Sequence, residues 1–119
     1  MKRVLVVDDN QEILDVIKIL MELNGYEVKC INSGLNLSDS VIDYDPNIIL
    51  LDIVLGDIDG RDLCRYLKGD PRTQHIPIII ISASDTIYSA GEKTCNAETF
   101  IPKPFDIQYL LTQVETYVN

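Results

Sequence analysis

The sequence predicts an α/β fold: a three-layer sandwich in which five helices cover both faces of a five-stranded parallel sheet. Five short apolar runs recur at intervals of about 20 to 30 residues. Three of these runs are continuous and do not alternate with polar residues, which is typical of strands covered on both faces. The segments between the runs are long enough for crossover helices, and right-handed crossovers build a layered sandwich. Five such strands favour the order 2-1-3-4-5.

The predicted strands are the apolar runs themselves. They cover residues 4–7, 28–31, 48–51, 78–81 and 99–101.

The first helix, over residues 11–24, is predicted with both of its ends. Asn10 is suited to the N-cap, and Gly25 is suited to the position after the C-cap, where a left-handed backbone is common. Apolar residues at spacings of i, i+4, i+7 and i+8 indicate the face that packs on the sheet. This stripe consists of Ile13, Ile17, Leu20 and Met21.

Four further helices are expected. Residues 37–44 form a short helix that Asp45-Pro46 ends, and residues 60–68 form one that Gly69-Asp70-Pro71 ends. The segment 85–94 contains Gly91 and several Ser and Thr residues, so its helix is expected to be the least stable of the five. A closing helix begins after Asp106, with an apolar stripe of Ile107, Leu110, Leu111, Val114 and Val118.

Composition and charge narrow the class of protein. With 119 residues the chain is expected to form one domain, 1–119. The formal net charge of −9 disfavours direct contact with nucleic acid or an anionic membrane. The longest apolar runs have four residues, so no membrane span is predicted. Cys30, Cys64 and Cys95 are too few and too scattered for a disulfide framework, which favours a reducing cytoplasm.

Polar residues follow the predicted strands where each strand ends. Asp8 and Asp9 follow the first strand, Asp52 the third and Ser82 the fourth, and the last strand leads to Lys103. Because ligands of such sheets bind beyond the carboxyl ends of the strands, these side chains are expected to share one site. Taken singly, each has an ordinary alternative as a cap, a turn residue or a surface charge. Their joint placement at four strand ends favours a site.

The chemistry of this set favours phosphoryl transfer to Asp52. Clustered carboxylates repel one another unless a cation joins them, and oxygen ligands in an open site suit Mg²⁺. A carboxylate can act as a nucleophile toward phosphorus, and a lysine and a hydroxyl can stabilise the charge on the phosphoryl oxygens.

The same residues carry a resemblance to a known family. The segments VLVVDDN (4–10), IILLDIVLGDIDG (48–60), PIIIISA (77–83) and FIPKPF (100–105) resemble response-regulator receiver domains of two-component signalling. The spacings agree too, with 43 residues from Asp9 to Asp52, 30 more to Ser82 and 21 more to Lys103. The resemblance covers the whole chain and implies a flavodoxin-like, CheY-like fold.

The resemblance implies a role for each residue. Asp52 would be the phosphoacceptor, and Asp8, Asp9, Asp52 and the backbone carbonyl of Val54 would hold Mg²⁺. Ser82 and Lys103 would contact the phosphoryl group, with a cis peptide bond between Lys103 and Pro104. Phe100 would be an aromatic switch residue that turns inward as Ser82 moves; its alternative is a core aromatic of the last strand.

The implied function is that of a signalling switch and not of an enzyme in the usual sense. A histidine kinase or a histidine phosphotransfer protein would be the phosphodonor. A target protein or a separate output domain would respond to the signal. The expected moving parts are the helix over 85–94 and the last strand and helix. A stand-alone receiver, a piece of a larger regulator or hybrid kinase, and a homodimer all stay open.

Gly56 and Asn96 are departures from the family pattern. Gly56 stands where the family usually has proline, and Asn96 stands where glycine is usual; Asn tolerates a left-handed backbone. Val54 is apolar beside the approach of water to Asp52, which predicts slow self-dephosphorylation.

The sequence disfavours other functions. An aspartyl phosphatase would need a second Asp at position 54. An interaction module that is not phosphorylated would lack the acceptor or the lysine, and a flavin site is disfavoured because the first loop is acidic.

Overall fold

The computed structural model describes residues 1–83 and 95–119, and it confirms the predicted fold class. A five-stranded sheet has the order β2-β1-β3-β6-β7, and every neighbouring pair is parallel. Numbered along the chain, these strands have the predicted order 2-1-3-4-5. Their bounds are β1 (Arg3–Val7), β2 (Glu27–Ile31), β3 (Ile48–Asp52), β6 (Ile78–Ala83) and β7 (Thr99–Lys103).

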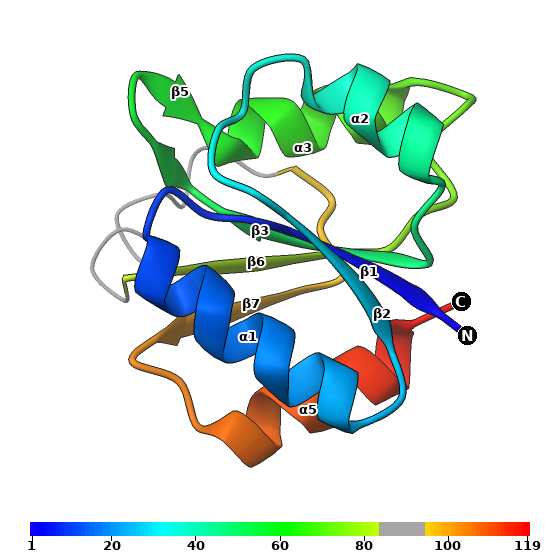
Figure 1. Cartoon of the computed structure of the whole chain (residues 1–119). Coiled ribbons are helices and arrows are strands. Elements are labelled where there is room, and N and C mark those ends of the chain that lie inside the picture. The colour runs from blue at the N-terminus through cyan, green and yellow to red at the C-terminus, as the bar shows by residue number, and fades with distance from the viewer. Residues whose placement is uncertain (84–94) are drawn as a thin grey trace.

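Helices cover both faces of this sheet. As Figure 1 shows, α1 and α5 lie on one face, and α2 and α3 lie on the other. Their bounds are α1 (Gln11–Leu23), α2 (Leu37–Tyr44), α3 (Gly60–Gly69) and α5 (Ile107–Tyr117). The helix predicted over residues 85–94 lies outside the described residues. None of the helices in the described part is both long and apolar enough to span a lipid bilayer.

The continuous apolar runs divide their side chains between two cores. On β1, Leu5 and Val7 belong to the core under α2 and α3, whereas Val4 and Val6 belong to the core under α1 and α5. Successive side chains of a strand point to opposite faces, so a strand between two helical layers needs an apolar residue at every position. All five residues of β3 are buried, which completes this pattern next to the site.

The ends of α1 are as predicted, but its buried stripe is displaced. The Asn10 side chain accepts hydrogen bonds from two backbone N–H groups of the first turn, and Gly25 has φ of +88°. The fully buried residues are Leu14, Ile17 and Met21, whereas Ile13 and Leu20 are only half-buried. The i, i+4, i+7 spacing therefore identified the face of α1 that packs on the sheet, but the centre of that face is slightly displaced from the predicted one.

The predicted apolar stripe of α5 is confirmed in the middle of the helix and wrong at its first residue. Leu110, Leu111 and Val114 are buried, and Asp106 caps the helix by accepting from the Tyr109 N–H. Ile107 is 52% exposed and is therefore not a core residue.

A short hairpin, which the sequence did not predict, connects β3 to α3. Its strands β4 (Val54–Leu55) and β5 (Ile58–Asp59) pair antiparallel, and Gly56 in the turn has φ of +64°. Two further backbone expectations are confirmed: the Lys103–Pro104 peptide bond is cis, and Asn96 has φ of +61°. The hairpin starts two residues after Asp52 and therefore borders the candidate site.

Candidate functional site

The sheet brings the predicted site residues to one edge. Asp8 directly follows β1, Asp52 is the last residue of β3, and Ser82 and Lys103 lie at the ends of β6 and β7. In the parallel register Asp52 is opposite Ile81, and position 83 is opposite Lys103. Because β1, β3, β6 and β7 are consecutive neighbours, residues separated by up to 95 positions in the chain become adjacent at this edge.

Three carboxylates form a cluster there. One carboxylate oxygen from each of Asp8, Asp9 and Asp52 lies within 4.8 Å of the other two. Asp8 and Asp52 are buried, with 2% and 5% of their surface exposed, whereas Asp9 is exposed. Each of the three carboxylates can provide an oxygen ligand, and one of them is open to solvent. Such a set suits a hard cation such as Mg²⁺ that retains part of its water.

Lys103 is the basic partner of this cluster. Its Nζ lies 2.8 Å from Asp8 Oδ2 and 3.5 Å from Asp52 Oδ2. The other oxygen of Asp8 accepts a hydrogen bond of 2.9 Å from the Asn10 backbone N–H. The ammonium group is therefore bound mainly to Asp8, and it reaches Asp52 only at the limit of a hydrogen bond.

The carboxyl group of Asp52 has a raised pKa. Burial is the main cause, because it removes water from the charged form, and the negative charge of Asp8 adds to it. Lys103 acts in the opposite direction, as do hydrogen bonds from the Ser82 hydroxyl and the Val54 backbone N–H. These donors also fix the orientation of the carboxylate. Asp52 is thus a buried, positioned carboxylate beside a second negative charge that a cation would neutralise.

Two further residues were predicted to take part in function: Val54, beside Asp52 in the sequence, and Phe100, on the last strand. Val54 is 50% exposed at the start of β4, two positions after Asp52. Phe100 on β7 is 37% exposed. The alternative of a core aromatic is therefore wrong for Phe100, which lies outside the core in this conformation.

Gly60 is a site-supporting residue that the sequence interpretation missed. A Cβ at this position would lie 1.9 Å from the Asp52 carbonyl oxygen and 3.0 Å from Ile53 Cα. The Gly60 N–H donates a 2.6 Å hydrogen bond to the Ile53 carbonyl. The start of α3 therefore packs directly on the backbone that carries Asp52. The segment IDG contained a signal, since a glycine at a helix start beside a strand end is typical of close backbone approach.

Comparison with known proteins decides the family. The family model of the response regulator receiver domain matches residues 4–115. The chain belongs to the response-regulator receiver family. Receivers are domains of two-component signal transduction and not conventional enzymes, and the triad of Asp8, Asp9 and Asp52 is an acidic cluster typical of a receiver Mg²⁺ site.

Relatives of this receiver occur in proteins of different lengths. It is 31% identical to the DNA-binding dual master transcriptional regulator RpaA of Synechocystis; the match covers 100% of this chain and 50% of RpaA. It is 29% identical to the polar-differentiation response regulator DivK of Brucella ovis, covering 99% of this chain and 97% of DivK. The chain thus spans half of one relative and nearly all of another.

A solved structure agrees with the fold. The signal receiver domain of a signal transduction histidine kinase from Syntrophus aciditrophicus superposes with a TM-score of 0.86 at 27% identity, over 98% of this chain and 89% of that one.

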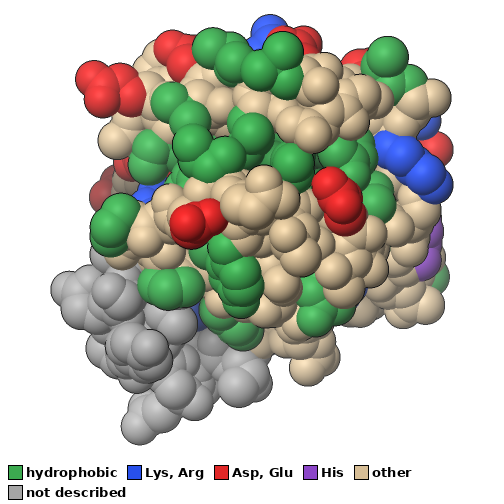
Figure 2. Space-filling view, turned by 90° about the horizontal axis from the view of Figure 1, so that it is seen from below, with side chains coloured by type: hydrophobic (Ala, Val, Ile, Leu, Met, Phe, Trp, Pro, Cys, Tyr) green, Lys and Arg blue, Asp and Glu red, His purple; other side chains and the backbone are tan. Residues whose placement is uncertain are grey.

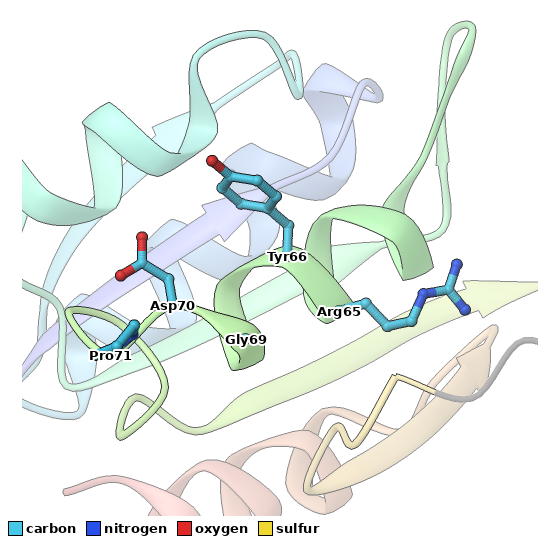
Figure 3. A pocket seen from close by; sticks show the side chains of 5 residues that line it. All are labelled: Arg65, Tyr66, Gly69, Asp70 and Pro71. Atoms are coloured by element: carbon cyan, nitrogen blue, oxygen red, sulfur yellow. The ribbon is translucent and has the colours of Figure 1, made fainter.

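Two hollows in the surface of the receiver lie outside the acidic cluster. One, of about 470 Å³, adjoins Lys103 and is lined mainly by apolar residues of α1 and of the start of α5. It belongs to the face on which Figure 2 shows apolar side chains gathered. The other, also about 470 Å³, lies at the end of α3 between Arg65, Tyr66 and Asp70 (Figure 3). Neither contains the three carboxylates, which lie at the open edge of the sheet.

Proposed function

We propose that residues 1–119 act as one receiver domain that accepts a phosphoryl group on Asp52. The observation that carries the proposal is the setting of the Asp52 carboxylate. It is buried, two donors orient it, and it lies beside the Asp8 carboxylate and within reach of Lys103. A carboxylate in such a setting can attack phosphorus, provided that the neighbouring negative charge is neutralised.

Mg²⁺ is the cation that this donor set fits. Asp8, Asp9, Asp52 and the Val54 backbone carbonyl would hold it, and when bound it would neutralise charge on the carboxylates and on the incoming phosphoryl group. The three clustered carboxylate oxygens support this assignment, because without a cation two buried negative charges oppose each other.

The phosphodonor in this proposal is a histidine kinase or a histidine phosphotransfer protein. An Asp52 oxygen forms a bond to phosphorus while the phosphorus–nitrogen bond to the donor imidazole breaks. The donor ring, protonated on its other nitrogen, takes the electron pair of that bond and leaves as neutral imidazole. Lys103 and Ser82 then contact the phosphoryl oxygens. Their present bonds to the carboxylates support these roles, since each already donates toward the acceptor group.

The signal would leave the site through Ser82 and β7. Phosphorylation adds about 1.5 to 2 negative charges and new acceptor oxygens, which draw Ser82 and Lys103 toward them. Phe100, outside the core in the present conformation, would turn inward as Ser82 moves. A target protein or an output domain would respond to this change. The net charge of −9 supports a protein partner over direct contact of this domain with nucleic acid. Three unpaired cysteines favour the cytoplasm as the place of action.

Phosphorylation by a small donor tests the proposal directly. Purified protein is incubated with acetyl phosphate and Mg²⁺, and the intact mass is measured under conditions that preserve acyl phosphates. Wild type should gain the mass of one phosphoryl group. Asp52→Asn should gain none, and wild type with EDTA should gain little. Asp57→Asn is a matched control, because this exposed hairpin carboxylate lies outside the acidic triad. If wild type and Asp52→Asn behave alike, the phosphoacceptor assignment is wrong.

A further inference from the structure

The same three-bond motif of an aspartate and an arginine occurs at both ends of α3. At the start of the helix, the Asp59 carboxylate accepts from the Arg61 backbone N–H at 2.8 Å, from its Nε at 3.0 Å and from its Nη2 at 2.7 Å. After the end of the helix, Asp70 accepts from the same three groups of Arg72 at 2.8, 3.2 and 2.9 Å. Each guanidinium therefore holds both oxygens of a carboxylate, which is a directional form of ion pair.

The two motifs differ in burial and in position. The side chains of Arg61 and Asp59 are 13% and 21% exposed, whereas the Arg72 side chain is 67% exposed. An exposed ion pair fixes little, because water and salt weaken it and two side chains lose freedom. The ten residues of α3 separate its two ends by about 15 Å, and Figure 3 shows Asp70 just after the helix. The shielded pair is therefore the one at the start of α3.

The Asp59–Arg61 pair fixes the residue that lies opposite Val54. Val54 pairs with Asp59 in the β4–β5 hairpin, which consists of two residue pairs and leads directly into α3 (Figure 1). Opposite residues of an antiparallel pair lie about 5 Å apart, so a shift of Asp59 is passed on to Val54. Because such a short hairpin is marginal by itself, its position depends on contacts like the one that Arg61 makes.

The start of α3 also packs on the backbone that carries the phosphoacceptor. The Gly60 N–H donates to the Ile53 carbonyl at 2.6 Å, and a Cβ at Gly60 would lie 1.9 Å from the Asp52 carbonyl oxygen. Residues 52–54 and 59–61 thus form one closely packed unit, and the guanidinium of Arg61 closes it on the helix side.

We propose that Arg61 is a positioning residue, which acts through Asp59 to hold the Val54 backbone carbonyl in place for Mg²⁺. This inference rests on the proposed Mg²⁺ site and adds to it a residue that does not touch the cation. Charge alone would give Arg61 the opposite effect. Replacing it by glutamine removes a positive charge near the site, which by itself would strengthen the binding of a divalent cation. Loss of a positioning contact would weaken that binding, so the direction of the change separates the two effects.

The test is the affinity of the folded full chain for Mg²⁺. It is measured by NMR titration of the amide signals of residues 8, 9 and 52 with MgCl₂ at constant ionic strength, and a dispersed spectrum in EDTA first shows that each variant is folded. Arg61→Gln should bind Mg²⁺ about tenfold more weakly than wild type, at the lower end of what the loss of a group supporting a metal ligand typically costs. Arg72→Gln is the matched control, because it removes the same motif at the far end of α3 and should bind like wild type.

A second variant keeps the result decisive. Arg61→Lys retains the positive charge, but an ammonium lacks the planar fork that holds both oxygens of Asp59. It should bind Mg²⁺ more weakly than wild type and more tightly than Arg61→Gln. If the glutamine variant does not fold, Arg61→Lys decides alone, and an affinity equal to that of wild type would overturn the proposal.

The remaining outcomes separate this inference from the function on which it rests. Arg61→Gln binding Mg²⁺ at least as tightly as wild type, or an equal loss in Arg72→Gln, would overturn the role of Arg61 and leave the cation site standing. No Mg²⁺-dependent shift at residues 8, 9 and 52 of wild type would mean that the proposed cation site is wrong, and the role of Arg61 with it.

Discussion

Asp52 is a buried residue whose proposed role as a nucleophile requires the charged form of its carboxyl group, which burial disfavours. Its pKa is raised by burial first and by the Asp8 charge second, and Lys103, Ser82 and Val54 offset only part of this. A raised pKa in the folded state means that the native protein binds this proton more tightly than the unfolded chain does. The contribution of Asp52 to stability is therefore complete at low pH and is lost as the pH rises through the raised pKa.

Replacement of Asp52 by Asn should therefore stabilise the protein at neutral pH. The amide keeps the shape and removes the buried charge, so without divalent cations the free energy of unfolding at pH 7 should rise by about 1 to 3 kcal/mol. Below the ordinary pKa of an aspartate the difference from wild type should disappear. Urea unfolding at several pH values measures both, with the exposed Asp57→Asn as the control. An Asp52→Asn variant that is less stable than wild type at pH 7 would contradict this account.

A second residue-scale prediction concerns the lifetime of the phosphoryl group. The Val54 side chain is half exposed at the start of β4, two positions after Asp52, and it offers an attacking water no hydrogen-bond partner. Val54→Asn supplies one and should speed loss of the phosphoryl group about tenfold, which corresponds to about 1.4 kcal/mol of activation free energy. The decay of phosphorylated protein after removal of acetyl phosphate measures this rate. Val54→Ala is the control, because it shortens the side chain without adding a polar group, and equal decay for both variants would count against the idea.

At the scale of elements, long patterned segments were predictable and short ones were not. The bounds of α2 agree with the sequence prediction to the residue, because Asp45-Pro46 marks its end. The β4–β5 hairpin was missed, because two-residue strands are too short to show a period and are identified only by their partner. The contact of Cys64 with Cys95 was missed for a similar reason: it depends on how α3 packs beside the chain entering β7, which spacing does not reveal.

The start of α3 gives an element-scale prediction with an internal control. Gly60 and Gly69 are the first and last residues of this helix. A Cβ at Gly60 would meet the Asp52 carbonyl at 1.9 Å, whereas a Cβ at Gly69 would meet nothing within 4 Å. Gly60→Ala should lower the free energy of unfolding by about 3 kcal/mol or more, because backbone rather than a flexible side chain must move. Gly69→Ala should stay within about 1 kcal/mol of wild type. Chemical denaturation compares the two, and similar losses would show that the close approach at Gly60 is unimportant.

At the scale of the whole molecule, strand order is what made the site predictable. Once the order 2-1-3-4-5 is assumed, the residues at the carboxyl ends of β1, β3, β6 and β7 must meet at one edge of the sheet, and the structure confirms that they do. Which partner each side chain prefers was not predictable. Lys103 binds Asp8 more closely than Asp52, at 2.8 Å against 3.5 Å, because that choice depends on ångström-scale backbone positions. The acidic cluster exists only in the folded chain, so its ligands act on the global folding equilibrium.

Mg²⁺ should consequently stabilise the entire fold. A ligand that binds only the native state, present at 100 times its Kd, adds about 2.7 kcal/mol to the free energy of unfolding, which raises the Tm of a domain of this size by roughly 10 °C. Because any salt screens the net charge of −9, the comparison requires KCl at matched ionic strength. Asp9→Asn, which removes the exposed carboxylate of the triad, should reduce the Mg²⁺-dependent rise, and Asp57→Asn should leave it unchanged. Calorimetry with MgCl₂, with KCl and with EDTA separates the two effects. An equal rise in KCl, or a full rise in Asp9→Asn, would mean that the stabilisation comes from screening and not from a cation held by the three carboxylates.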